Sequence, residues 1–247
     1  MKKNKLLLHK QILAAVLSGG ILLLPNWGYA LPQGGQVVAG TGSIGTPGGD
    51  QMNITGSGNV AIDWNSFNVA QGESVKFSGM QAVLNYVTGN TKSEIFGNIS
   101  GNGVHVFLVN PNGILFGATA SVNVGELTAS TRTIDNRKSF DGTAFSTLSP
   151  EAAQKVRGDI INLGELTADK ILLEGDNISL LNAHMLKSSG NGNITLRADN
   201  KVTVGYEVTD KTTINVGDDA PGGHTVSDYT TGTGTEGSTV LAGAAVQ

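Results

Sequence analysis

The stretch from Ile95 to Ile114, IFGNISGNGVHVFLVNPNGI, constrains the fold of this chain more than any other. No Asp, Glu, Lys or Arg occurs from Ile95 to Gly125. Asparagines, glycines and a proline interrupt the apolar residues, whereas a membrane-spanning helix needs about 20 mostly apolar residues in a row. In residues 104–109, VHVFLV, apolar side chains occupy both alternating faces. That pattern predicts a strand that is buried on both sides.

The strand ends in the tetrapeptide Asn110-Pro111-Asn112-Gly113, followed by Ile114. Proline presets the second angle of a type I turn, asparagine can cap the turn from its first position, and glycine suits its last position. We therefore expect a tight turn between two core strands. We call these four residues the NPNG turn.

The first thirty residues have the pattern of a secretory signal peptide. Four lysines among the first ten residues precede an apolar stretch from Ile12 to Leu24, which is too short to span a membrane. Small residues occupy the two cleavage-site positions of Gly28-Tyr29-Ala30. We predict that residues 1–30 are the leader and that cleavage falls between Ala30 and Leu31.

The composition indicates an all-β chain of many short strands. Glycine is abundant, with 35 residues, while only 15 % of the residues are charged. The chain has no cysteine, so its core must supply stability without disulfides. The formal net charge is −4, and four of the 16 basic residues lie in the leader. This acidic balance argues against nucleic acid or an anionic membrane as the partner.

Short alternating segments separated by Gly- and Asn-rich turns predict the strands. The predicted strands are Gln36–Ala39, Met52–Thr55, Val60–Ile62, Ser74–Phe77, Ala82–Tyr86, Lys170–Leu173, Asn177–Leu181, Asn193–Arg197 and Lys201–Val204. The element VGELTA at 124–129 recurs as LGELTA at 163–168. Irregular repetition of a strand-turn unit favours a solenoid, with a β-sandwich as the competing architecture.

Two segments depart from this repetition. Residues 134–158 are polar and include Ser149-Pro150-Glu151, the signature of a helix start, so we predict a small helical excursion from the strands. Residues 217–247 are rich in Gly and Thr and predict a loose tail or the beginning of a truncated passenger. The domain between leader and tail then covers residues 31–216.

The sequence offers little for catalysis or metal binding. The four histidines lack partners at metal-ligand spacing, and we interpret His105 as a strand-surface residue rather than a ligand. Many β-helix proteins are polysaccharide lyases or hydrolases, and a hydrolase needs paired carboxylates. Glu126 and Glu165 hold equivalent positions of the repeated element, which predicts a solvated row of carboxylates rather than an acid-base pair. We expect no cofactor, no metal and no enzymatic activity.

Four segments in order resemble the secretion domain of two-partner secretion exoproteins, the filamentous-haemagglutinin-like family. They are LPQGGQVVAGTGSI at 31–44, IDWNSFNVAQGESVKF at 62–77, SEIFGNISGNGVHVFLVNPNG at 93–113 and SVNVGELTAST at 121–131. The family's second motif, of Asn-Pro-Asn-Leu type, is replaced here by NSFN at 65–68, to which no role is transferred.

The resemblance implies a right-handed parallel β-helix with short antiparallel capping strands. It also implies export through the periplasm of a diderm bacterium, recognition by the periplasmic domains of a partner outer-membrane transporter, and folding outside the cell. Asn110, Pro111, Asn112, Gly113 and Ile114 match the family's central motif, with recognition and a fixed turn as their implied role. The resemblance implies a secreted or cell-surface protein, with adhesion to host cells or glycans as the commonest purpose. A free short adhesin and a β-helix enzyme are the alternatives.

Overall fold

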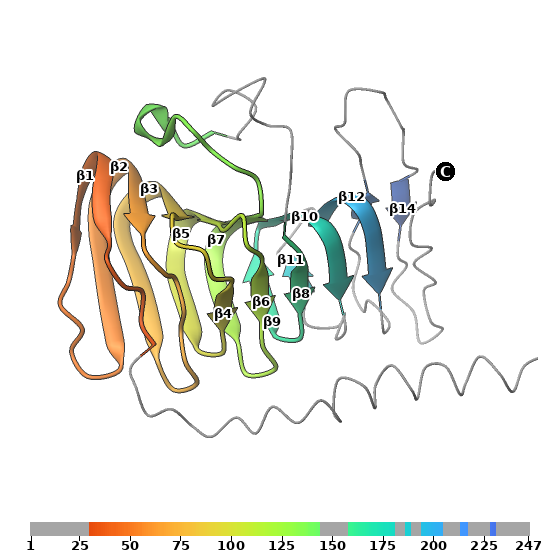
Figure 1. The fold of residues 1–247 in the computed structure, drawn as a ribbon, viewed down its shortest axis with the longest axis horizontal. Coiled ribbons are helices and arrows are strands. Elements are labelled where there is room, and N and C mark those ends of the chain that lie inside the picture. The colour runs from red at the N-terminus through yellow and green to blue at the C-terminus, as the bar shows by residue number, and fades with distance from the viewer. Residues whose placement is uncertain are drawn as a thin grey trace, which may run out of the picture.

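The computed structural model describes residues 30–143 and 158–180 together with strands at 186–188, 194–204, 213–216 and 228–230 (Figure 1). The strands stack along one axis, from β1 at one end to β14 at the other (Figure 1). They are β1 (Gln36–Ile44), β2 (Gln51–Trp64), β3 (Ser74–Val87), β4 (Ser93–Ile95), β5 (Asn98–Val109), β6 (Ile114–Phe116), β7 (Ser121–Ser130), β8 (Ile160–Asn162), β9 (Glu165–Ala168), β10 (Lys170–Leu180), β11 (Leu186–Ser188), β12 (Ile194–Val204), β13 (Thr213–Val216) and β14 (Asp228–Thr230).

Three parallel ladders form the sides of the stack. The first ladder joins the N-terminal halves of β2, β3, β5 and β7 to β9 and β11. The second ladder joins the C-terminal halves of β2, β3, β5 and β7 to the first halves of β10 and β12 and to β13. The third ladder joins β4, β6 and β8 to the second halves of β10 and β12. This architecture is the predicted parallel β-helix, and the β-sandwich is excluded.

At each end of the stack, the last strand pairs antiparallel with its neighbour, as predicted for capping strands. At the N-terminal end, β1 pairs antiparallel with β2. At the other end, β14 pairs antiparallel with β13. β14 lies within the predicted tail 217–247, and the rest of that tail lies outside the described residues. The division into leader, domain and tail therefore stays a prediction.

The prediction of separate short strands was wrong at the corners of the coils. Met52–Thr55 and Val60–Ile62 belong to one continuous strand, β2, which bends at a register shift between Thr55 and Gly58. Gly58 has a φ of 61°, which glycine adopts without strain. The chain therefore turns the corner through a glycine-containing irregularity instead of leaving the ladder.

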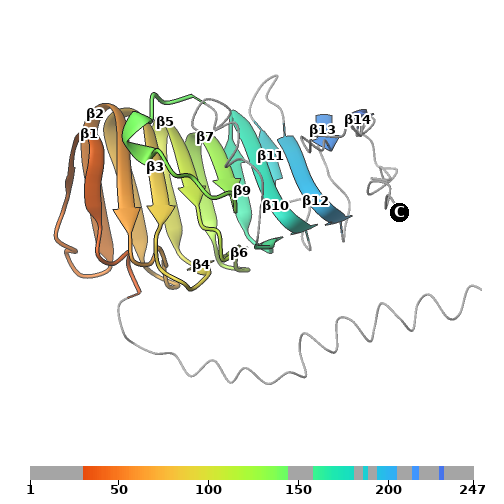
Figure 2. The ribbon, with the colours of Figure 1, turned by 45° about the horizontal axis from the view of Figure 1, so that its top comes forward.

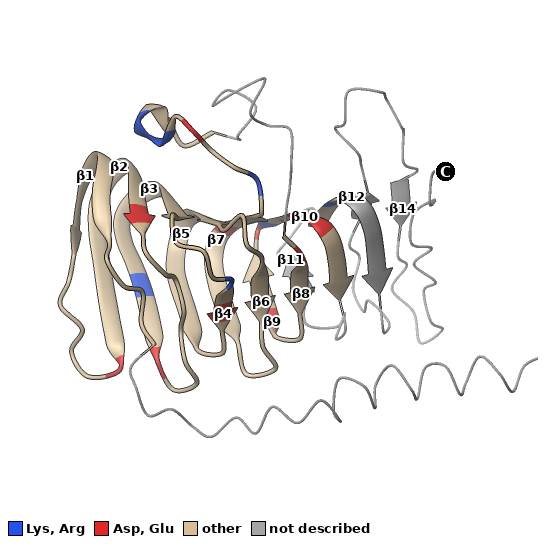
Figure 3. Ribbon diagram, viewed as in Figure 1, with Lys and Arg blue, Asp and Glu red and all other residues tan. Residues whose placement is uncertain are grey.

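Within the second ladder, β5 is buried on both faces from Val106 to Val109, as its apolar alternation predicts. Val104, Val106 and Leu108 point into the main core between the three ladders. Phe107 and Val109 point outward into a second apolar cluster, which also contains Ile134 and Phe140. Figure 3 shows the corresponding lack of charge over β5 and β6.

The described part of the predicted excursion, residues 134–143, covers this outward cluster. It contains a short 3₁₀ helix, η1 (Arg137–Ser139), and lies over the N-terminal strands in both ribbon views (Figures 1 and 2). The helix start predicted at 149–151 lies outside the described residues. Within the part of the chain that the structure describes, no helix has the length and apolar character to span a membrane.

Candidate functional site

The NPNG turn occupies the corner between the second and third ladders. It follows β5 and precedes β6, so its backbone joins two buried strands. The N–H of Gly113 donates to the carbonyl of Asn110 at 3.0 Å, and the side-chain oxygen of Asn110 accepts the N–H of Asn112 at 2.9 Å. The predicted tight turn, capped by its first asparagine, is confirmed.

Asn110 is fully buried and links the turn to the preceding coil. Its side-chain amide donates to the carbonyl of Thr91 at 2.9 Å and to the hydroxyl of Ser93 at 3.0 Å. Its backbone N–H donates to the carbonyl of Ser130 in the following coil at 2.9 Å. Asn110 therefore forms hydrogen bonds with both the preceding and the following coil. Its side chain is inaccessible to solvent once the protein is folded.

The other residues of the NPNG turn and Ile114 complete this corner. Exposed Asn112 donates from its side chain to the carbonyl of Gly89 at 2.8 Å, and Pro111 is half-buried. Ile114 is buried and donates its N–H to the carbonyl of Asp159 at 3.0 Å. A side chain at Gly158 would meet the backbone nitrogen of Gly113 at 2.3 Å, so the next coil approaches the turn as closely as backbones allow.

The same corner holds a buried carboxylate in the later coils. The side chain of Glu174 is 3 % exposed and accepts from the hydroxyl of Ser130 at 3.0 Å. Arg132 and Arg197 each donate to it at 3.2 Å. The two guanidinium groups compensate the charge of the carboxylate, as a buried ion needs. Sequence reasoning missed this cluster because its members come from β7, the loop that follows it, β10 and β12.

The predicted cleavage site lies at the start of the described chain, against a second buried carboxylate. Ala30 is half-buried and donates its backbone N–H to the carboxylate of Glu73 at 2.9 Å. Leu31 is fully buried in the main core. Glu73 itself is 6 % exposed. Cleavage at this position stays a prediction, and both residues of the predicted site lie within the described fold.

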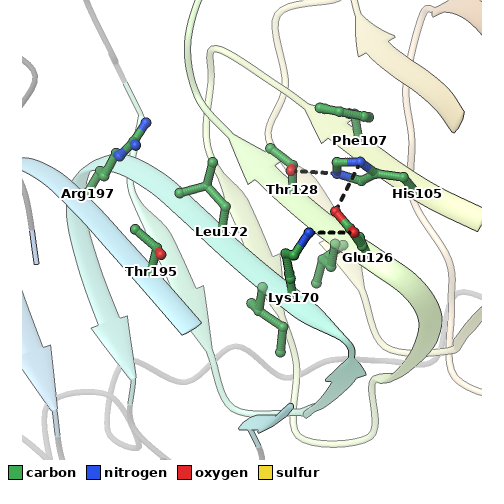
Figure 4. Close-up of a pocket in the computed structure, with 10 residues that line it drawn as sticks. His105, Phe107, Glu126, Thr128, Lys170, Leu172, Thr195 and Arg197 are labelled. Atoms are coloured by element: carbon green, nitrogen blue, oxygen red, sulfur yellow. Dashed lines mark hydrogen bonds and ion pairs between the residues drawn. The ribbon is translucent and has the colours of Figure 1, made fainter. Parts of the chain in front are cut away.

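A cleft of about 220 Å³ lies on the outer face of the second ladder (Figure 4). His105 stacks on Phe107 with ring centroids 3.9 Å apart, and its Nε2 lies 2.9 Å from the hydroxyl of Thr128. Glu126 lies 3.5 Å from Nδ1 of His105 and accepts from Lys170 at 3.0 Å. Burial lowers the pKa of His105 to about 4, against the opposing influence of Glu126. The imidazole is therefore neutral at pH 7, and its contact with Glu126 is not an ion pair.

The predicted row of Glu126 and Glu165 is wrong. In the ladders, Glu126 lies opposite Lys170, whereas Glu165 lies opposite Ser121. The two copies of the repeated element therefore stand on different sides of the coil, because the excursion interrupts the chain between them. Among the described residues, no group of three or more His, Cys, Asp or Glu side chains is arranged to hold a metal ion.

Asp159 and Asp176 form a carboxylate pair that sequence reasoning missed. Both accept from the side-chain amide of Asn177, at 2.8 and 3.1 Å. Asn177 also donates its backbone N–H to Asp159 at 3.2 Å. The side-chain amide of Asn177 thus links β10 to the residue that precedes β8.

Comparison with known proteins identifies relatives of this chain. The chain is 31 % identical over 173 residues to a heme/hemopexin-binding protein of Haemophilus influenzae, covering 67 % of the chain and 19 % of that relative. A second heme/hemopexin-binding protein from the same organism is 37 % identical over 108 residues, covering 42 % of the chain and 12 % of the relative. The chain thus spans a fifth or less of the length of these curated relatives.

The fold matches a solved structure of the same kind. The crystal structure of the HMW1 secretion domain from Haemophilus influenzae superposes with a TM-score of 0.52 at 25 % identity, covering 76 % of this chain and 62 % of that one. The family described as the TPS secretion domain matches residues 30–237, which includes the coils, the NPNG turn and β14. The chain belongs to the TPS secretion domain family of two-partner secretion exoproteins.

Proposed function

We propose that this domain directs export of its exoprotein by binding, while still extended, to the periplasmic domains of a partner outer-membrane transporter. The match to the TPS secretion domain over residues 30–237 is the observation that carries the proposal. The leader brings the chain to the periplasm, the transporter recognises Asn110 to Ile114, and the domain folds outside the cell. The mature protein is then secreted or held at the cell surface.

The burial of Asn110 supports recognition of the unfolded chain. In the folded domain its side chain is 0 % exposed and all its polar atoms are engaged within the corner. A transporter can therefore contact this side chain only before the coils form. Pairing of an extended segment with an exposed sheet edge is the physical mode that suits such a chain.

Folding outside the cell would bias transport outward. Each parallel coil buries its apolar side chains against the coil before it, so the folded part cannot easily return through a barrel as an extended chain. The first coils would then seed the stacking of those that emerge later. The proposal needs no nucleotide and assigns no catalytic step to the domain.

The test is secretion of the chain from a diderm host with and without the partner barrel. We expect the protein in the medium only when the barrel is present. Release without the barrel, or retention in the periplasm with it, would contradict the proposal. The same assay on Asn110→Ala and Pro111→Ala tests the recognition role.

A matched variant separates recognition from folding. Asn85 is a fully buried asparagine outside the motif, which accepts from Nε1 of Trp64 at 3.1 Å and donates to the carbonyl of Phe107 at 3.2 Å. Asn85→Ala and Asn110→Ala should each destabilise the fold by about 1–3 kcal/mol, because each orphans buried partners. If Asn110 belongs to a recognition motif, Asn110→Ala will reduce export much more than Asn85→Ala does. Equal export of the two variants would assign the motif a purely structural role.

Adhesion to host cells or glycans remains a second proposal. The cleft on the second ladder combines carboxylate, hydroxyl and cationic groups with apolar side chains, a mixture that suits a sugar. Binding of the purified domain to cells, lost in Glu126→Ala, would support a free adhesin. Depolymerisation of a polysaccharide by the purified domain, lost in Asp159→Asn, would instead support an enzyme.

A further inference from the structure

Glu73 is a nearly buried carboxylate that meets only neutral donors among the described residues. Glu73 is the last residue of the turn Ala70–Glu73, and its backbone N–H donates to the carbonyl of Ala70 at 3.0 Å. Gly72, within this turn, has a φ of 87°. One side-chain oxygen accepts the N–H of Ala70 at 2.8 Å, and the other accepts the N–H of Ala30 at 2.9 Å. None of the ion pairs in the described part of the chain includes Glu73, which is 6 % exposed.

A buried carboxylate without a cation is costly, because neutral hydrogen bonds replace only part of its lost hydration. Among the described residues, the other buried carboxylate is Glu174, which pairs with two arginines. Glu73 instead receives a peptide N–H from a residue 43 positions earlier, at the predicted leader boundary. Among the described residues, Glu73 therefore has no cationic partner while Ala30 is still part of the chain.

Cleavage between Ala30 and Leu31 would supply that cation. It removes the Ala30 N–H from Glu73 and creates an α-ammonium group on Leu31. The side chain of Leu31 is fully buried in the main core, which holds the new terminus in place. Adjacent residues are only about 3.8 Å apart along the chain, so the ammonium group forms within one residue of the carboxylate.

We propose that the Glu73 carboxylate is the binding site for the α-ammonium group that signal-peptide cleavage creates at Leu31. The proposal rests on the export route given above, because it requires that cleavage. Its consequence is that the mature domain contains an ion pair that the precursor lacks. Removal of the leader then stabilises the fold, and folding in turn buries the processed end.

The experiment first determines, by sequencing, the N-terminal residue of the processed chain recovered from the periplasm of a host without the barrel. It then compares two purified chains, one beginning at Leu31 and one that retains Gly28-Tyr29-Ala30, each with and without Glu73→Gln. Glu94→Gln is the matched control, since Glu94 forms an exposed ion pair with Lys92 at 3.0 Å. The readouts are the denaturant midpoint and the rate at which an acylating reagent modifies the α-amine at pH 7, measured by mass spectrometry.

We expect Glu73→Gln to lower the midpoint more in the chain that begins at Leu31 than in the extended chain. The α-amine of Leu31 should react about tenfold more slowly in the wild-type chain than in Glu73→Gln, the ratio that one unit of pKa difference produces. If Glu73→Gln prevents folding, the wild-type chain with an acetylated α-amine at Leu31 is used in its place. Its denaturant midpoint should be lowered by the same amount.

Equal effects in both chains, or a different N-terminal residue, would overturn the assignment. These measurements use folded protein in solution and do not involve the barrel. A failure of barrel-dependent export therefore leaves this result unchanged, and the two proposals fail separately.

Discussion

Arg137 donates to both oxygens of the Asp63 carboxylate, at 2.7 and 3.1 Å, although 74 residues separate the two in the sequence. The guanidinium also lies over the ring of Tyr86, 4.3 Å from its centroid. Arg137 comes from η1, whereas Asp63 and Tyr86 come from β2 and β3. The pair therefore fixes the excursion over the apolar outer face of the second ladder, where the rings of Phe140 and Phe107 meet edge to face.

Arg137→Ala should lower the free energy of unfolding by about 2 kcal/mol, because a partly buried, two-bonded ion pair and a cation–π contact are lost together. Chemical denaturation measures this loss. Arg137→Lys should recover only part of it, since an ammonium group cannot form the planar pair. Lys92→Ala breaks an exposed pair and should cost less than about 1 kcal/mol. Equal losses of unfolding free energy in Arg137→Ala and Lys92→Ala would contradict the inference that Arg137 holds the excursion against the second ladder.

His105 should make the fold less stable in mild acid. Burial lowers its pKa to about 4 in the folded state, against an ordinary value of 6.5. The unfolded chain therefore binds the proton first, and the stability that neutral His105 allows is lost as the pH falls from about 6.5 to about 4. Above pH 6.5 that stability is fully present.

Denaturation midpoints at pH 7 and pH 4.5 measure this effect. Glu126 and Lys170 face His105 from the next two coils, and both are unchanged in the variant His105→Gln. His105→Gln should reduce the difference between the two midpoints relative to the wild type. An unchanged difference would show that protonation of His105 does not cause the acid response.

Glu174→Ala should destabilise the domain by about 3 kcal/mol, because it leaves Arg132 and Arg197 without the carboxylate that compensates them. The unfolding free energy measures the loss, with Glu94→Ala as the exposed control. A loss as small as that of the control would mean that solvent already screens the cluster.

Gly158→Ala tests the close packing against the NPNG turn. The added Cβ would lie 2.3 Å from the backbone nitrogen of Gly113, so the coils must move apart, at a cost of about 1–3 kcal/mol. Gly48→Ala places its Cβ in open space and should change stability by less than about 0.5 kcal/mol. Thermal unfolding compares the two variants, and equal melting temperatures would argue against tight packing at this corner.

Much of the fold could be predicted from local patterns. The two-sided apolar alternation of 104–109 required a strand buried on both faces, and Asn110 to Gly113 required a turn, since both follow from rules that act over a few residues. The ordered segments between 31 and 131 identified the family. The glycine corners were misread because a bulge and a break in a strand have the same local sequence signature.

The tertiary structure alone decided which residues meet across coils. The pairing of Glu126 with Lys170, of Glu174 with two arginines, and of Glu73 with the N–H of Ala30 depends on how many residues each coil contains. The excursion between β7 and β8 lengthens one coil and changes that register, so Glu165 stands opposite Ser121 despite its repeated sequence. Local sequence therefore determined the strands and the turn, while coil length, set by the packing of the whole stack, decided the charged contacts.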